Sequence, residues 1–515
     1  MEQEIWLRWA TLAVSLLYCL VSLRRRHCSG RLPPGPRPLP VIGNALDLRR
    51  GYLHHTLARL ARTYGPIMRL QLGPAPAVVI SSRDAAREAF TRHDRRLAER
   101  YTVDAVRALG WADRFLLNMP SSDPLWKLQR GILATHVFSP RSLSAARGVC
   151  ERKVRDLVAH FRARARQEVD VGKALCGGMI NLVCSTFFSV DVVDVDAAGC
   201  DVDFPRVPAR VGNFPTVDGA SPNVQVDGRV KLVPPLYCDP SWCLAPWLNE
   251  LPREAAIEEN QARGAASRGG REIYRIVDGI IERRLAENAA AASSKDDDRH
   301  GDFLQVLLDL MSAGKIDQAT MKAIVFEVIT TGSDTITVTM EWAMAELLRN
   351  PGAMARVHAE IGGALGGKET IGEADAASLP YLQAVVKEAM RLHPVAPLLV
   401  PHKAVEDGVE VCGYAVPKGC TVFINVWAIM RDPAVWEDPG EFVPERFLGK
   451  AAGLDFKGKD GASSSSSSRS GGRRQCPGLP MAERVGMSAE ELDVSERFTT
   501  GNVLAVPLLP IAVVT

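Results

Sequence analysis

The chain has 515 residues, 46% hydrophobic and 24% charged, a composition typical of a folded protein with a large core. This composition excludes a disordered chain, a collagen-like fibre and a small disulfide-stabilised domain. The 62 basic and 60 acidic residues leave a net charge of +2, so nucleic acid is not an expected partner.

The first segment in chain order is an apolar run at the amino terminus. Ile5–Leu23 is apolar apart from Arg8 and small polar side chains, and as a helix it would rise about 28 Å, close to the roughly 30 Å hydrocarbon core of a bilayer. Residues 24–26 are three arginines, which the positive-inside bias places in the cytosol. A cleaved secretory peptide is the alternative, but its charges usually precede the apolar run. We therefore predict an uncleaved membrane anchor over residues 1–26.

The next segment, residues 27–44, is a proline-rich hinge. Five of the nine residues in Leu32–Pro40 are proline, which fixes φ and lacks a backbone donor. We therefore expect a stiff, extended spacer rather than a helix. It would hold a cytosolic body, residues 45–515, at a fixed distance from the bilayer.

The body that follows is mostly helical in its hydrophobic pattern. Apolar side chains recur at the spacing of a helix face in Ser144–Arg164, Glu272–Glu287, Phe303–Met311, Met321–Leu348, Pro351–Leu365 and Leu379–Leu392. Short strands are predicted at Ile67–Leu72, Ala77–Ile80, Val409–Val411 and Thr421–Asn425. The sequence therefore predicts a mainly α fold with small β-sheets.

Two stretches break this pattern, and one glycine-rich motif is deceptive. Gly199–Pro246 contains eight prolines, too many for a long helix, and residues 461–471 contain a serine run that indicates a loop. Gly362–Lys368 resembles a phosphate-binding loop, but Glu369 follows where a hydroxyl should hold magnesium. We interpret that motif as a glycine-rich helix end.

The most informative motif surrounds Cys476, one of eleven cysteines. Their odd number and wide spacing indicate mostly reduced thiols. Cys476 lies between Gly472 and Gly478 and precedes Pro477, a residue favoured in the first turn of a helix. A sulfur at a helix N-terminus is favoured as the thiolate, the form that a haem iron binds, and Gly478 would let a flat macrocycle approach the backbone. If the motif stood alone, a structural or incidental cysteine would be an equal alternative.

Charged motifs upstream give Cys476 its context. Glu388 and Arg391 lie one turn apart on a predicted helix and share a face, and a second arginine, Arg446, follows downstream. This ordered set resembles the cytochrome P450 family. The anchor and proline hinge resemble its microsomal plant type, in particular the geraniol 8-hydroxylase-like group. The resemblance covers nearly the whole chain and implies one haem-thiolate domain over residues 45–515.

The resemblance also implies roles for individual residues. Cys476 would be the proximal ligand to the iron of haem b. A structural triad behind the haem would consist of Glu388, Arg391 and Arg446. The haem and its propionates would be held by Trp126, Arg130, His402, Arg474, Gly472 and Gly478. Carboxylates brought into an apolar pocket need such cationic donors, although Trp126 and Arg130 alone would be an ordinary helix face.

On the long predicted helix, the resemblance places an oxygen-activation motif at Thr331–Thr335. Gly332 would leave room for dioxygen, and Thr335 would hydrogen-bond to a carbonyl of its own helix and open a kink that admits water. Asp334 and Thr335 would be the catalytic residues that relay protons. Thr331 stands where the family usually has alanine, a change that leaves the relay intact.

The same resemblance outlines the substrate pocket. Its walls would include Arg100–Met119, the segment before Thr331, Pro394–Val400 and Phe498–Gly501. The apolar side chains in Pro394–Val400 suit a lipophilic, terpenoid-like substrate, although any core strand shows the same stripe.

Three features depart from the family pattern. Arg469 stands where the haem loop usually has an aromatic residue, and the prolines of Gly199–Pro246 oppose the helix that should roof the pocket. After Cys476, Leu479–Val485 is followed at once by Gly486, so that much of the expected helix and the strand after it are missing. Errors of splicing or gene prediction, or a degenerate gene copy, would explain these features. Sequencing the transcript would distinguish them.

Two functions from different classes follow. The first is a single-pass monooxygenase of the endoplasmic reticulum membrane, with a cytosolic catalytic domain, that hydroxylates a small lipophilic substrate with O2. The chain has no nicotinamide or flavin fingerprint, so electrons from NADPH would come through a partner, NADPH-cytochrome P450 reductase. The second is a non-catalytic relative that does not bind haem productively. A haem-thiolate isomerase is disfavoured because Asp334 and Thr335 retain the proton relay.

Overall fold

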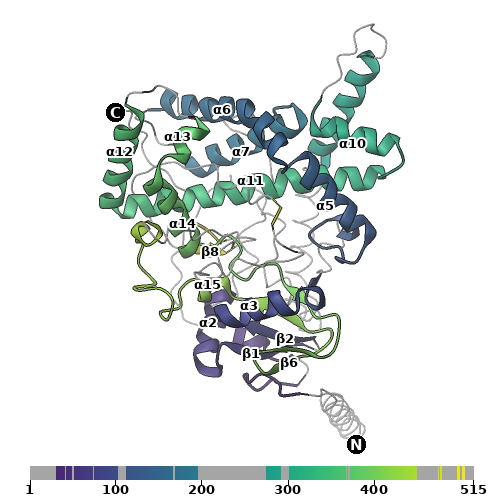
Figure 1. Ribbon diagram of the computed structural model, residues 1–515, viewed down its shortest axis with the longest axis vertical. Coiled ribbons are helices and arrows are strands. Elements are labelled where there is room, and N and C mark those ends of the chain that lie inside the picture. Colours follow the sequence, from purple (N-terminus) through teal and green to yellow (C-terminus); the bar gives the residue numbers. More distant parts are fainter. Residues whose placement is uncertain are drawn as a thin grey trace, which may run out of the picture.

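Helices make up most of the fold in the computed structural model of the chain (Figure 1), which confirms the mainly α prediction with small sheets. The structure describes residues 30–40, 42–48, 52–73, 75–101, 112–165, 167, 169–194, 274–291, 301–366, 368, 372–448, 474, 476–477, 496–498 and 502–504. Several expectations lie outside the described residues, namely those on residues 1–26, 199–246, 461–471 and 479–486 and on Gly472 and Gly478.

The longest helix, α11 (Gln318–Arg349), crosses the centre of the helical part. Its N-cap is Asp317, whose side chain accepts a hydrogen bond from Thr320 N at 2.8 Å. Buried side chains lie on all its faces. Its main neighbours are α7 (Val171–Phe188), α10 (Phe303–Ser312), α12 (Pro351–Leu365) and α14 (Pro380–Leu392). A helix buried in this way is stabilised mainly by packing and serves as the axis of the core.

One described helix, α7, is long and apolar enough to cross a membrane. However, 78% of that stretch is buried inside the fold, packed against α11 and against α6 (Pro140–Ala163). It is therefore a core helix. Its apolar residues surround the whole helix, which leaves little periodicity for a sequence pattern to detect, and it was not predicted.

The other helices are short or flank this core. They are α2 (Leu53–Tyr64), α3 (Arg83–Arg92), α5 (Pro124–His136), residues 274–291, α13 (Glu373–Ala377) and α15 (Val426–Ile429). Single turns of 3₁₀-helix form η2 (Ala45–Leu48), η3 (Asp94–Arg96), η4 (Ala112–Arg114) and η6 (Pro444–Phe447). None of the six cysteines in the described part of the chain is part of a disulfide.

A five-stranded sheet lies beside α2 and α3, at the opposite end of the molecule from α6 and α12 (Figure 1). Its order is β1 (Ile67–Leu72), β2 (Ala75–Ile80), β7 (Thr421–Ile424), β4 (His402–Lys403) and β3 (Glu99–Arg100). Only the β2–β7 pair is parallel, with Val78 opposite Val422. Val78 lies in the same hydrophobic cluster as buried side chains of α3, whereas Val79 lies in the same cluster as buried side chains of α2. The two helices therefore cover opposite faces of the sheet.

Two hairpins complete the β-structure. They are β5 (Val409–Val411) with β6 (Tyr414–Val416), and β8 (Glu496–Phe498) with β9 (Asn502–Leu504). Of these strands, only β5 was predicted. Three residues are too few to show a clear alternation of apolar and polar side chains.

The glycine-rich motif at residues 362–368 is the end of a helix. Helix α12 ends at Leu365, and its cap Gly366 has φ of 50°, in the left-handed region that favours glycine. Lys368 Nζ pairs with Asp375 at 2.7 Å. This geometry confirms the interpretation that the motif is no phosphate-binding loop.

The proline-rich hinge packs along the sheet. Pro34 O accepts a hydrogen bond from Arg69 N at 2.7 Å, and Pro33 and Pro36 are buried. A Cβ added at Gly35 would lie 2.0 Å from Arg69 O. The stretch forms no helix, as the prolines predict, but it packs against the folded body instead of standing free as a spacer.

We expect Gly35→Ala to lower the free energy of unfolding by about 1–3 kcal/mol, because its Cβ would meet a backbone oxygen that cannot rotate away. Thermal unfolding followed by circular dichroism would measure the change. Gly362→Ala is the matched control, since a Cβ there meets no heavy atom within 4 Å and alanine favours the helix. Equal thermal midpoints for the two variants would contradict close packing of the hinge.

Candidate active site

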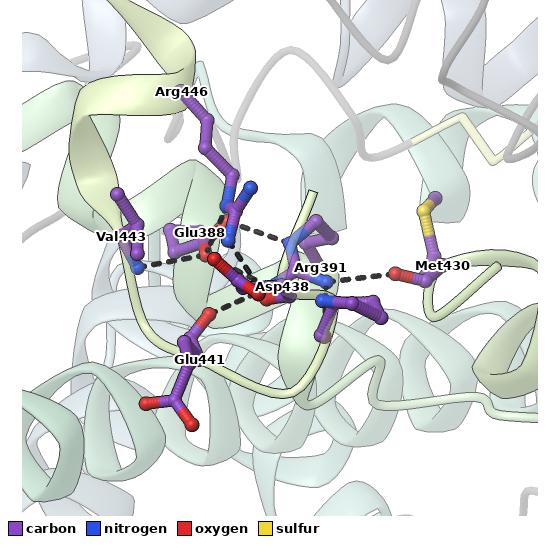
Figure 2. A network of polar contacts seen from close by, with 8 residues as sticks. Glu388, Arg391, Met430, Asp438, Glu441, Val443 and Arg446 are labelled. Carbon is purple, nitrogen blue, oxygen red and sulfur yellow. Dashed lines mark hydrogen bonds and ion pairs between the residues drawn. The ribbon is translucent and has the colours of Figure 1, made fainter. Parts of the chain in front are cut away.

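A buried charge cluster joins α14 to the segment that follows α15 (Figure 2). Glu388 and Arg391 are both 0% exposed. Arg391 Nε donates to Glu388 Oε2 at 2.7 Å, and its Nη2 donates to Oε1 at 2.8 Å. Arg446 Nε donates to the same Oε1 at 3.3 Å. The structure thus brings together the three side chains expected to form the triad.

Every N–H group of Arg391 has an acceptor, which matches the five donors of a guanidinium. Besides the two bonds to Glu388, Nη1 donates to Met430 O at 2.8 Å and to Pro439 O at 2.9 Å, and Nη2 donates to Glu441 O at 3.0 Å. A buried ion pair offsets its dehydration cost only with such additional bonds. The pair therefore holds the segment from residue 430 to residue 446 against α14.

A second cluster of charge surrounds Trp126 of α5. The ring is 6% exposed, and the guanidinium carbons of Arg474 and Arg130 lie 5.1 and 5.7 Å from its centroid. Trp126 Nε1 donates to Leu116 O at 3.2 Å, and Arg474 Nη1 donates to the same oxygen at 3.1 Å. Three of the expected haem-binding side chains therefore lie together.

The electrostatics of this cluster involve Cys476. Burial lowers the pKa of Arg130, while the negative charge of the Cys476 thiolate raises it, so the sulfur lies within electrostatic reach of that guanidinium. Burial, and next the positive charge of Arg130, lowers the pKa of Arg474 to about 10. Arg474 is further held by bonds from Nε to Ala98 O at 2.6 Å and from Nη2 to Met119 O. The fold thus places two half-buried cations close to the cysteine.

His402 lies on β4 and is 2% exposed. Its Nδ1 is 2.7 Å from Leu97 O and donates to it, whereas its Nε2 has no hydrogen-bond partner among the described residues. Burial, followed by the positive charge of Arg100, lowers the pKa of His402 well below its usual value, so Nε2 is an acceptor in the neutral ring. A carboxylate next to this ring would raise its pKa and convert Nε2 into a donor.

These residues fit the edge of a haem. A buried imidazole nitrogen without a partner, together with the half-buried guanidiniums of Arg130 and Arg474, provides what two propionate carboxylates need in an apolar surrounding. The exposed Cys476 lies in the same region and is not part of a disulfide, and a cysteine thiolate binds haem iron. The remaining expected members, Gly472 and Gly478, lie outside the described residues.

The expected proton relay lies on α11. Thr335 Oγ1 donates to Thr331 O at 2.8 Å, so the predicted bond to a carbonyl of its own helix is present. The helix nevertheless runs unbroken from Gln318 to Arg349, without the expected opening. Asp334 is half-buried, and burial raises the pKa of its carboxyl to about 7. A carboxyl with a pKa raised this far can carry a proton near neutral pH.

Gly332 has a different neighbour from the one expected. A Cβ added there would lie 3.3 Å from Val183 Cγ2 of α7, so the glycine allows the two core helices to pack closely. The sequence instead predicts that Gly332 leaves room for dioxygen. A sequence pattern does not reveal which of several surrounding elements a helical glycine faces.

Sequence reasoning missed one polar residue of this region, Glu327 on α11. Its Oε2 accepts a hydrogen bond from Leu116 N at 2.8 Å, and its Oε1 accepts one from Leu117 N at 3.0 Å. Burial raises the pKa of Glu327 to about 7, while the two amides lower it. One signal was present in the sequence, because Glu327 is a single charge within the apolar run Ala323–Ile329.

The site can be compared with known proteins. A family model described as Cytochrome P450 matches residues 33–198 and 263–486. The chain is 50% identical to a protein named Cytochrome P450 76M5 and 49% identical to Ent-cassadiene C11-alpha-hydroxylase 1, both from Oryza sativa subsp. japonica, over 99% of each chain. It is 37% identical to Carnosic acid synthase from Salvia pomifera, over 91% of this chain and 88% of the relative. The matched residues leave out 199–262, which contains all eight prolines of Gly199–Pro246, and end at Gly486.

We expect Glu388→Ala to lower the free energy of unfolding by about 3–5 kcal/mol, because it leaves the buried charge of Arg391 without its partner. Thermal unfolding of the detergent-solubilised chain would measure the loss. Arg92→Ala is the control, since Arg92 is 73% exposed and pairs with Glu88 at 3.0 Å, a surface pair worth less than about 1 kcal/mol. If both variants lost the same stability, the central role of the buried pair would be refuted.

Proposed function

Because this chain belongs to the cytochrome P450 family, whose cofactor is haem b and whose activity is monooxygenation, we propose that it is a membrane-anchored enzyme that hydroxylates a small terpenoid-like substrate. One observation carries the proposal for the site: Arg130 and Arg474 lie together on the Trp126 ring, and Arg130 is within electrostatic reach of Cys476. The substrate class is supported by relatives whose names include Ent-cassadiene C11-alpha-hydroxylase 1.

In this proposal the described cluster holds the cofactor. Cys476 would be the iron ligand, and Arg130, His402 and Arg474 would bind the propionates, with Trp126 packed beside the two arginines. Bound haem would supply the activation of O2 and the insertion of one oxygen atom into a C–H bond. Glu388, Arg391 and Arg446 would act structurally, because all their described bonds go to one another or to backbone groups.

The proton relay would be carried by Asp334 and Thr335. The Thr335 hydroxyl donates its hydrogen to Thr331 O, which leaves the oxygen of Thr335 able to accept a hydrogen bond from a neighbour. With a pKa of about 7, the Asp334 carboxyl holds a proton at neutral pH and can also release it. Asp334 would supply protons, and Thr335 would direct them into the site.

The membrane and the electron source belong to the same proposal. Residues 1–26 would form a single-pass anchor in the endoplasmic reticulum, with residues 45–515 as one catalytic domain in the cytosol. Electrons would come from NADPH-cytochrome P450 reductase, since the chain carries no nicotinamide or flavin fingerprint of its own. Arg469 and Arg473 would help to form its docking face.

A second candidate function is a relative that no longer binds haem productively. It is favoured by one observation, namely that the family match leaves out residues 199–262 and ends at Gly486, soon after the ligand cysteine. These are the segments that would roof the pocket and lie beneath the haem. The two candidates differ in a property that is simple to measure, which is haem incorporation.

The spectrum of the reduced carbon monoxide complex tests the first candidate. Full-length protein expressed in microsomal membranes should show a thiolate-type Soret band, and Cys476→Ser should lose it, because a serine hydroxyl is not an equivalent ligand. Cys412→Ser is the matched control, an exposed free cysteine on the β5–β6 hairpin, and should keep the band. A wild-type chain without bound haem would support the second candidate instead.

The relay predicts a pH dependence. The acid form of Asp334 prevails below its pKa of about 7, so product formation should fall as the pH rises through 7. Asp334→Asn should lower turnover by about 100-fold and remove this dependence, measured as hydroxylated product from a panel of diterpene hydrocarbons that includes ent-cassadiene. Asp309→Asn, an exposed carboxyl on α10, should leave both rate and profile unchanged. An Asp334→Asn profile equal to that of the wild type would exclude Asp334 as the proton donor.

A further inference from the structure

We propose that Glu327 is a positioning residue, whose carboxylate fixes the segment Phe115–Met119 against α11 and so sets the place of the Leu116 peptide group between the substrate pocket and the haem edge. This inference rests on the proposed function, in which Phe115–Met119 belongs to the pocket wall and Arg474 binds a propionate.

The first observation is the pair of hydrogen bonds at the carboxylate. Glu327 Oε2 and Oε1 accept from the consecutive amides of Leu116 and Leu117 at 2.8 and 3.0 Å. These amides belong to a turn outside helices and strands, so no ladder of backbone bonds holds them. Above the pKa of Glu327, which is about 7, both of its oxygens are acceptors on an ionised group, and bonds to an ionised acceptor are roughly twice as strong as those between neutral groups. The carboxylate therefore supplies the hydrogen-bond acceptors that backbone carbonyls of a neighbouring strand would supply in a sheet.

The second observation is that the segment lies along α11 at more than one point. The Phe115 ring stacks on Phe326, with centroids 5.4 Å apart and an interplanar angle of 16°. Arg114 Nη1 donates to Thr320 Oγ1 at 2.8 Å and pairs with Asp317. The Arg114 pair is more than one-third exposed on both sides and is weak for that reason. The hydrogen bonds to the half-buried carboxylate of Glu327 are thus the stronger polar contact between this segment and α11.

The third observation concerns the other side of the same residue. Leu116 O accepts from Trp126 Nε1 at 3.2 Å and from Arg474 Nη1 at 3.1 Å, and Arg474 Nη2 donates to Met119 O. The N–H of Leu116 therefore faces α11, while its C=O faces two residues of the proposed haem edge. A shift of this short segment would move the pocket wall and the acceptor of Arg474 together.

A carboxylate suits this position because it offers acceptors on both oxygens. In Glu327→Gln one oxygen becomes an NH2 group, which would face a backbone N–H and leave it without an acceptor. The chain contains a matched pair of bonds elsewhere: Glu360 Oε1 and Oε2 accept from Tyr381 N and Leu382 N at 2.7 and 2.9 Å. Glu360 lies on α12, where it caps the start of α14.

Hydrogen–deuterium exchange of the full-length protein in membranes, followed by mass spectrometry with residue resolution, tests the proposal. Glu327→Gln should speed exchange at Leu116 and Leu117 by about tenfold or more, the effect of losing a charge-assisted bond, and Glu360→Gln should do so only at Tyr381 and Leu382. Unchanged exchange at Leu116 and Leu117 would overturn the proposal. Glu327→Asp, which keeps the charge with a shorter reach, should show an intermediate effect and serves if Glu327→Gln does not fold.

Transfer of haem to apomyoglobin provides the functional readout. Glu327→Gln should lose haem several-fold faster than the wild type, since the acceptor of Arg474 is displaced, whereas Glu360→Gln should match the wild type. Equal rates in the two variants would reduce Glu327 to a structural residue and overturn the positioning role. A wild-type chain that holds no haem would refute the proposed function, and the exchange measurement, which needs no haem, would still test the tie between Glu327 and the segment.

Discussion

The structure depends on the burial of charge that is neutralised by its surroundings. Glu388 and Arg391 have no exposed surface, and a pair of this kind is stable only where other groups complete its hydrogen bonds. Arg391 obtains them from carbonyls at residues 430, 439 and 441, and Glu388 obtains one from Val443 N at 2.9 Å. An irregular segment is thereby held without a ladder of its own, directly before the chain that leads to Cys476.

The second charge cluster is built in the opposite way. Around Trp126, burial lowers the pKa of both Arg130 and Arg474, and the positive charge of Arg130 lowers the pKa of Arg474 further. His402 remains neutral with one nitrogen unpartnered in the described part of the fold. Such a cluster gains stability from a bound dianion such as haem. The core pair thus stabilises the fold by itself, whereas in the proposed function this cluster would be completed by haem.

The predicted elements succeeded or failed for identifiable physical reasons. The bounds predicted for α12, Pro351–Leu365, and for β1, Ile67–Leu72, agree with the structure, because one begins at a proline and the other is bounded by Gly65-Pro66 and Gly73-Pro74. Helix α7 was missed because apolar residues surround it. Strands β3 and β4 have two residues each and show no pattern, although β4 carries His402.

The sequence by itself determined the family and the chemical groups of the site. The motif around Cys476 and the spacing of Glu388 and Arg391 consist of particular side chains at fixed distances along the chain. Such patterns can be read directly from the sequence. Only the tertiary structure decided that the proline hinge packs on β1 and that Glu327 binds the amides of the Leu116 segment. These contacts involve backbone N–H and C=O groups, which are the same in every residue apart from proline. The fold decides which side chain or strand they meet, so the amino-acid sequence alone does not predict these contacts.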